Sequence, residues 1–133
     1  MDVSEIKLLK TMLIDVLDKG KVSVVVIRNE LEEYYRLLKC NYVESYRAVI
    51  GDKTFDIICD DEAKLHPNGT PSVINSDNQP VLINNVLICN RDYDGYTSLS
   101  DEDIELIKKQ IFSGHAIDKD NNSKPIEVLK LYD

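Results

Sequence analysis

The sequence predicts an α+β fold, in which a mostly antiparallel sheet is built from hairpins and about three helices. Apolar, β-branched runs recur on either side of short loops that contain Gly, Asn or Pro, as in hairpins. Between them lie segments whose apolar residues repeat at helical spacing. The 133 residues fit one domain. Within it we expect a leading amphipathic helix (residues 1–20), an α+β core (21–113) and a terminal hairpin or edge strand (114–133).

Residues 1–20 predict a helix because apolar side chains recur every three or four positions, with Ser4 at its start and Gly20 at its end. A stripe this wide needs cover from another surface. That surface is the domain's own sheet, a second copy or another partner, so a homodimer through the leading helix is one expectation. The stripe comprises Val3, Ile6, Leu9, Leu13, Val16 and Leu17.

The expected core begins with a strand over residues 21–27, which we place at the centre of the sheet because so many β-branched residues follow one another. Asn29 and Glu32 predict a capping box for a helix over 30–40. Residues 42–50 and 54–59 then flank a Gly-containing loop and predict a hairpin.

A Pro- and Asn-containing loop follows the first hairpin, and short apolar runs at 73–74 and 81–83 predict a second hairpin. The stretch 81–112 has the strongest local signals. An apolar run leads into an Asp94-Gly95 turn, and Ser100 with Asp103 forms a capping box that opens a helix. After Gly114, apolar and polar residues alternate over 115–120 and 126–132, which predicts the terminal hairpin or edge strand.

Composition restricts the class of protein. A formal net charge of −8 disfavours direct binding of nucleic acid. No apolar run is long enough to span a membrane, and the first residues do not resemble a secretory signal. Cys40, Cys59 and Cys89 are odd in number and lie in apolar segments, which indicates reduced thiols. We therefore expect a soluble, cytoplasmic, acidic protein.

Residues 90–101 match the ligand spacing of a calcium loop. Asn90, Asp92 and Asp94 take the first three ligand positions, and Asp101 takes the closing one. A strand precedes this loop where a helix is usual, and Asp is short for bidentate binding. A hairpin turn followed by the Ser100 cap explains the same residues. We favour the hairpin and keep calcium as the alternative.

No residue set forms a catalytic or cofactor signature. The spacing of His66 and His115 relative to Cys59 and Cys89 indicates neither a zinc site nor a Cys-His pair. The acidic triplet 60–62 is typical of a solvated strand end, and no glycine-rich phosphate loop is present. We expect no cofactor and no enzymatic activity.

Tyrosine gives the clearest sign of a binding surface. The chain has seven tyrosines and no tryptophan. Tyr93 and Tyr96 bracket a turn together with Asp92 and Asp94, where aromatic rings are hard to bury. A small-molecule site would instead need local positive charge for a phosphate. The candidates for that role are Arg28, Arg47, Lys64 and Arg91.

Four short motifs lie within residues 21–112: Asp61-Glu62-Ala63-Lys64-Leu65, Pro67-Asn68, Asp94-Gly95 and the run from Thr97 to Ile104. On these motifs, residues 21–112 resemble a family of small proteins of unknown function encoded by phages, prophages and conjugative elements of Gram-positive bacteria. The family has no established activity, so the resemblance implies only a mobile-element accessory protein in a bacterial cytoplasm. Gly69-Thr70-Pro71 departs from the family, which often continues there with a basic and an apolar residue.

Two functions therefore remain open. The protein is a non-catalytic anti-defence or accessory protein that binds and modulates a host defence or DNA-transaction protein. Alternatively, it binds or sequesters a nucleotide-like signal, with an oligomer as one way of forming the pocket. Cations clustered around a concave site favour the second function, and a flat face with exposed Tyr93 and Tyr96 favours the first.

Overall fold

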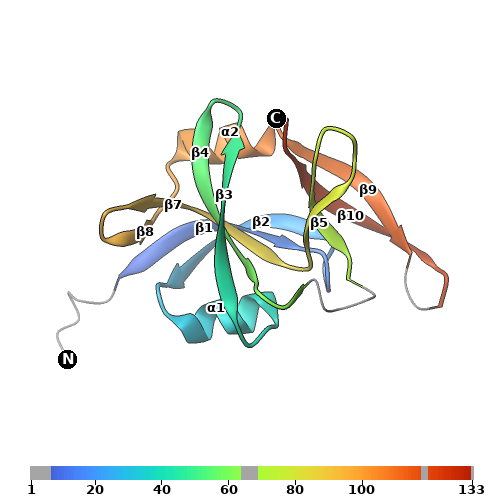
Figure 1. Cartoon of the computed structure of the whole chain (residues 1–133), viewed down its shortest axis with the longest axis horizontal. Coiled ribbons are helices and arrows are strands. Elements are labelled where there is room, and N and C mark those ends of the chain that lie inside the picture. The colour runs from blue at the N-terminus through green and yellow to red at the C-terminus, as the bar shows by residue number, and fades with distance from the viewer. Residues whose placement is uncertain (1–6, 64–68, 118–119, 133) are drawn as a thin grey trace.

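A computed structural model shows a mainly β structure of two sheets and two helices (Figure 1). The structure describes residues 7–63, 69–117 and 120–132. The helices are α1 (Leu31–Leu38) and α2 (Asp101–Lys108). No helix within these described ranges has the length and apolar character needed to cross a bilayer.

The first sheet has six strands in the order β2-β1-β7-β4-β3, with β8 beside β7, and all its neighbours are antiparallel. Its strands are β1 (Leu8–Asp15), β2 (Lys21–Arg28), β3 (Val43–Ile50), β4 (Lys53–Asp60), β7 (Val86–Asp92) and β8 (Gly95–Thr97). The second sheet has the order β6-β5-β10-β9, and its β5–β10 pair is parallel. Its strands are β5 (Pro71–Ile74), β6 (Pro80–Ile83), β9 (Ile111–Ile117) and β10 (Ser123–Lys130).

The first sheet is buried on both faces, which creates two hydrophobic cores. One face packs against the second sheet and α2, through Met12, Ile14, Phe55, Ile57, Ile88, Ile107 and Leu129. The other face packs against α1, through Leu9, Leu13, Tyr34, Leu38, Ile58 and Leu87. Below, the second of these is called the α1 face.

The predicted α+β class with about three helices is wrong, because the leading helix is a strand. Residues 8–15 form β1, which lies between β2 and β7. Successive side chains of β1 enter the two cores in turn, so Leu9 and Leu13 pack on one face and Met12 and Ile14 on the other. A strand buried on both faces is apolar at nearly every position, and such a run resembles a wide helical stripe. Residues 1–6 of the expected helix lie outside the described residues.

Two further details differ from the sequence prediction. β2 is an edge strand and not a central one. The N-cap of α1 is Glu30, whose side chain makes no capping hydrogen bond, while the oxygen of Asn29 accepts a hydrogen bond from the Tyr34 hydroxyl. The capping box predicted from Asn29 and Glu32 is therefore absent.

The hairpins β3–β4 and β5–β6 lie where the sequence predicts them, and Ser100 and Asp103 form the predicted capping box of α2. The last two strands also form a hairpin, which begins at Ile111. Only β9 is at the edge, because β10 is enclosed between β9 and β5.

Candidate functional site

Three of the side chains selected from the sequence meet on the α1 face of the first sheet. The strand register places Arg47 on β3 opposite Asp56 on β4, and Arg91 on β7 opposite Tyr96 on β8. Asp56 is also opposite Cys89, two residues before Arg91, so these side chains share one face. We call Ser45, Arg47, Asp56, Arg91 and Tyr96 the Arg–Tyr cluster.

Asp56 is the buried centre of the cluster, with a side chain only 3% exposed. Its Oδ2 lies 3.2 Å from Nη1 of Arg91, and its Oδ1 lies 3.5 Å from Nε of Arg47. A buried carboxylate requires such partners, because removing them would leave an uncompensated charge. The side chains of Arg47 and Arg91 are 67% and 48% exposed, so several of their N–H donors still face solvent. These donors could bind a carboxylate or a phosphate.

Tyr96 is held in place on several sides. The guanidinium carbon of Arg91 lies 5.7 Å from the centre of its ring. The ring of Tyr34 meets it edge-on, with 6.0 Å between ring centres. The Tyr96 hydroxyl and Ser45 Oγ share a hydrogen bond. Burial raises the pKa of Tyr34 above its usual value, so this supporting phenol stays neutral. Tyr96 is therefore a half-buried, fixed part of the cluster.

Tyr93 lies at the turn between β7 and β8, and its side chain is fully exposed. The turn is fixed locally, because Oδ1 of Asp92 accepts a hydrogen bond of 2.8 Å from the backbone N–H of Asp94. Gly95 follows with φ of +121°, a conformation that other residues rarely adopt. The hairpin therefore presents Tyr93 to solvent on a short, fixed support.

Arg28 does not join the cluster. It is at the last position of β2, opposite Leu8 at the start of β1, and is exposed. Lys64, the fourth cation considered for a phosphate, lies outside the described residues. The Tyr93 turn and the Arg–Tyr cluster thus contain every selected binding residue except these two.

The residues of the calcium-loop alternative are used in other ways. Nδ2 of Asn90 donates to Oδ2 of Asp103 at 2.7 Å and to the carbonyl of Ser98 at 3.1 Å. Asp101 forms an ion pair with Lys10 at 2.9 Å. Over the described ranges, no three His, Cys, Asp or Glu side chains are grouped so that they could hold a metal ion. Residues 90–101 instead form the β7–β8 hairpin and lead into the capping box of α2.

The cysteines are free thiols held in neutral form. Burial, together with nearby carboxylates, raises the pKa of Cys59 and of Cys89 to about 12. The pKa of Cys40 is raised to about 11, again mainly by burial. His66 lies outside the described residues, and His115 is on β9. A nucleophile needs a thiolate, so the described surroundings of these cysteines do not favour one.

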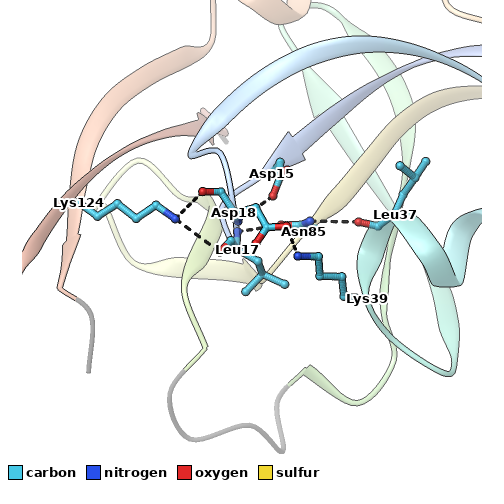
Figure 2. A network of polar contacts seen from close by, with 7 residues as sticks. All are labelled: Asp15, Leu17, Asp18, Leu37, Lys39, Asn85 and Lys124. Carbon is cyan, nitrogen blue, oxygen red and sulfur yellow. Dashed lines mark hydrogen bonds and ion pairs between the residues drawn. The ribbon is translucent and has the colours of Figure 1, made fainter. Parts of the chain in front are cut away.

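Sequence reasoning missed the role of Asn85, which is 1% exposed. Figure 2 shows its side chain between two distant segments. Oδ1 accepts a hydrogen bond from the N–H of Leu17 at 3.1 Å, and Nδ2 donates to the carbonyl of Leu37 at 3.0 Å. In the same network, Lys124 donates to the carbonyl of Asp18 at 2.8 Å, and Asp18 pairs with Lys39. An Asn pair between apolar runs predicts only a turn, so no sequence signal marks this contact.

Sequence reasoning also missed Ser45 and Asp56, although a signal for them exists. In a two-residue hairpin the alternation of side chains places Ser45, Arg47 and Asp56 on one face. Counting back from the turn would have grouped these residues.

A groove of about 890 Å³ lies apart from the cluster, between the β1–β2 turn and the second sheet. It is lined mostly by apolar side chains, and none of Arg28, Arg47 and Arg91 lines it. The phosphate candidates that the structure describes therefore do not converge on this groove.

The model of one protein family, a domain of unknown function termed DUF3846, matches residues 10–112. Neither a curated protein nor a solved structure is significantly similar to the chain.

Proposed function

The chain belongs to the DUF3846 family, a domain of unknown function, and we propose that it is a non-catalytic protein that binds and modulates another protein. The observation that carries this proposal is Tyr93, a fully exposed aromatic residue on a fixed hairpin. Tyr and Arg are enriched among the residues that dominate binding energy at protein interfaces. A tyrosine has few rotatable bonds, and the hairpin already fixes the backbone of Tyr93, so binding orders little further chain.

The Arg–Tyr cluster extends the same surface from the base of the hairpin. Arg91 is on the strand that leads into the Tyr93 turn, and Tyr96 is on the strand that leaves it. The exposed guanidinium groups offer donors for acidic side chains of a partner. We propose that Tyr93 enters a pocket on the partner while Arg47 and Arg91 pair with carboxylates around it.

The resemblance to mobile-element proteins supports a host protein as the partner, in a bacterial cytoplasm. The net charge of −8 favours a protein partner over nucleic acid. A host protein that binds DNA carries a basic surface, which the acidic surface of this chain would complement.

A second candidate is a nucleotide-like signal bound by the Arg–Tyr cluster. The donors of Arg47 and Arg91 favour an anion, and Tyr96 could stack on a base. The 890 Å³ groove does not serve this candidate, because none of Arg47, Arg91 and Tyr96 lines it.

Affinity capture of the tagged full chain from a Gram-positive lysate tests both functions, with mass spectrometry of bound proteins and of small molecules. We expect a stoichiometric protein that is lost with Tyr93→Ala and retained with Tyr42→Ala. Tyr42 is a matched control, because it is 60% exposed and precedes β3. A bound nucleotide without a protein partner, lost with Arg91→Ala, would refute the first function and support the second.

A further inference from the structure

We propose that the chain forms a two-fold dimer in which β2 of one copy pairs in antiparallel orientation with β2 of a second copy. β2 is eight residues long and forms one edge of the first sheet. The side chains of Val24 and Val26 are 40% and 61% exposed, and no charged residue lies between Lys21 and Arg28. A long, apolar, uncharged edge is a template for pairing with another strand.

The backbone of β2 has hydrogen-bonding groups available for such a partner. The N–H of Val22 donates to Oε1 of Glu127 on β10 at 2.8 Å, and therefore points away from β1. Because the direction of the backbone groups alternates along a strand, the N–H and C=O groups of Val24 and Val26 also point away from β1, like the N–H of Val22. Within the described residues, none of these four groups has a hydrogen-bond partner. They would supply two pairs of hydrogen bonds to a second strand.

Two other edge strands, β3 and β6, carry protection that β2 does not. β3 carries Glu44 and Arg47 within its length. β6 has four residues and begins at Pro80, which cannot donate a hydrogen bond. β9 carries no charge within its seven residues, but Gly114 in its interior has no side chain and weakens the strand. Charge, proline and short length are the usual means of keeping strand edges apart. Of these edges, β2 has the most β-branched residues and no charge or proline in its interior, so we assign the pairing to β2.

Charge complementarity identifies the occupant as a second copy. With Val25 on the two-fold axis, Val24 lies opposite Val26 of the second copy. This register places Arg28 of the second copy opposite Val22, where the Glu127 carboxylate lies. Arg28 forms no ion pair among the described residues, so it is available. Symmetry then creates two Arg28–Glu127 pairs, one at each end of the joined strands.

The first test is the molecular mass in solution, measured by light scattering on the full chain. We expect a dimer, twice the chain mass of 15.2 kDa. Val26→Pro should give a folded monomer, because its N–H points away from β1 and proline costs no internal hydrogen bond. Val49→Pro on β3 is the matched control and should remain a dimer. Val49 is 54% exposed, and its N–H also points away from its neighbour strand. A monomeric native chain, or a folded Val26→Pro dimer, would overturn the proposal.

The second test probes the register by disulfide formation, and it does not depend on how Val26→Pro folds. Opposed residues on the axis form a non-hydrogen-bonded pair, with Cα atoms about 4.5 Å apart, which suits a disulfide. Under mild oxidation Val25→Cys should form a crosslinked dimer on non-reducing gels. Ser23 is more exposed than Val25. In the dimer it would lie opposite Ile27 of the second copy, so Ser23→Cys should crosslink much less than Val25→Cys. Equal crosslinking of the two variants would contradict this register and this interface.

A charge reversal completes the test. Arg28→Glu would place a carboxylate beside Glu127 of the second copy, so we expect the dimer dissociation constant to rise at least tenfold at low salt. Arg36→Glu is the control, because Arg36 is exposed on α1 and pairs with Glu33 of its own helix. An equal effect of the two reversals would show that net charge, and not the Arg28–Glu127 pair, controls association.

Discussion

At the scale of single residues, the carboxylate of Asp103 joins three separate parts of the chain. It accepts hydrogen bonds from the backbone of Ser100, from Nδ2 of Asn90 and from Nζ of Lys53. Burial alone would raise the pKa of Asp103. The hydrogen bonds from Lys53, Ser100 and Asn90 outweigh burial and hold the pKa at about 2.

A lowered carboxyl pKa predicts a loss of stability in acid. The unfolded chain binds a proton at Asp103 near pH 4, whereas the folded chain binds it only near pH 2. The stabilisation is therefore complete above about pH 4 and is lost as the pH falls to about 2. In urea unfolding, we expect Asp103→Asn to reduce the change in unfolding free energy between about pH 4 and pH 2 by about 1–2 kcal/mol. The effect is no larger because solvent screens the half-exposed Lys53. Glu102→Gln, on the exposed side of α2, should leave the acid transition unchanged.

The thiols give a second prediction at this scale. Because burial raises the pKa of Cys59 and Cys89 to about 12, few molecules carry a thiolate at neutral pH. We expect a thiol reagent to label both at least about 100-fold more slowly in the folded chain than in urea. Cys40 is partly exposed and should react first. Fast labelling that persists in Cys40→Ser would contradict the buried positions of the other two.

The sequence predicts such sites only as far as their contacts are local. Ser100 and Asp103 are three positions apart, and their capping box follows from that spacing. Lys53 reaches the same carboxylate from the β3–β4 turn, fifty positions away. The Arg–Tyr cluster shows the same division, because Arg91 and Tyr96 share one hairpin while Asp56 comes from another. The pairing of two hairpins depends on sheet order, which no local pattern encodes.

At the scale of elements, residues 8–15 show where periodicity fails. Their apolar residues suit a helix or a doubly buried strand, and only the burial of both faces decides between them. β2 shows the opposite error, because its run of valines indicates a central strand although it is an edge. An apolar edge is consistent with a strand that is buried only after a second copy pairs with it.

Asn85 provides the prediction at this scale, because it joins the β1–β2 turn to the end of α1 (Figure 2). Asn85→Ala would leave the N–H of Leu17 and the carbonyl of Leu37 without their partner in a buried place. We expect a loss of about 2–3 kcal/mol in the free energy of unfolding. Lys39→Ala is the control, since it removes only the exposed ion pair with Asp18 and should cost less than about 1 kcal/mol. Equal losses in urea unfolding would show that the Asn85 contacts do not hold the two elements together.

At the scale of the whole molecule, the two sheets share one core, so neither is complete without the other. Leu129 of β10 is fully buried against Met12, Phe55 and Ile88 of the first sheet. β10 is also the centre of the second sheet, where it pairs with β5 and β9. The family match ends at residue 112, before β10 begins. The alternation in the tail predicts a strand there but gives no sign that it enters the centre of a sheet.

This arrangement predicts that the molecule unfolds as one unit and that β10 controls the stability of both sheets. Leu129→Ala would leave a cavity in the shared core and should lower the free energy of unfolding by about 2–5 kcal/mol. Because the core is shared, hydrogen exchange should accelerate by the same factor at amides of β7 in the first sheet and of β5 in the second. Ile117→Ala is the control. Its side chain on β9 is 72% exposed, so the change should be within about 0.5 kcal/mol. Faster exchange confined to the second sheet would instead show that the sheets are separate folding units joined by a weak interface.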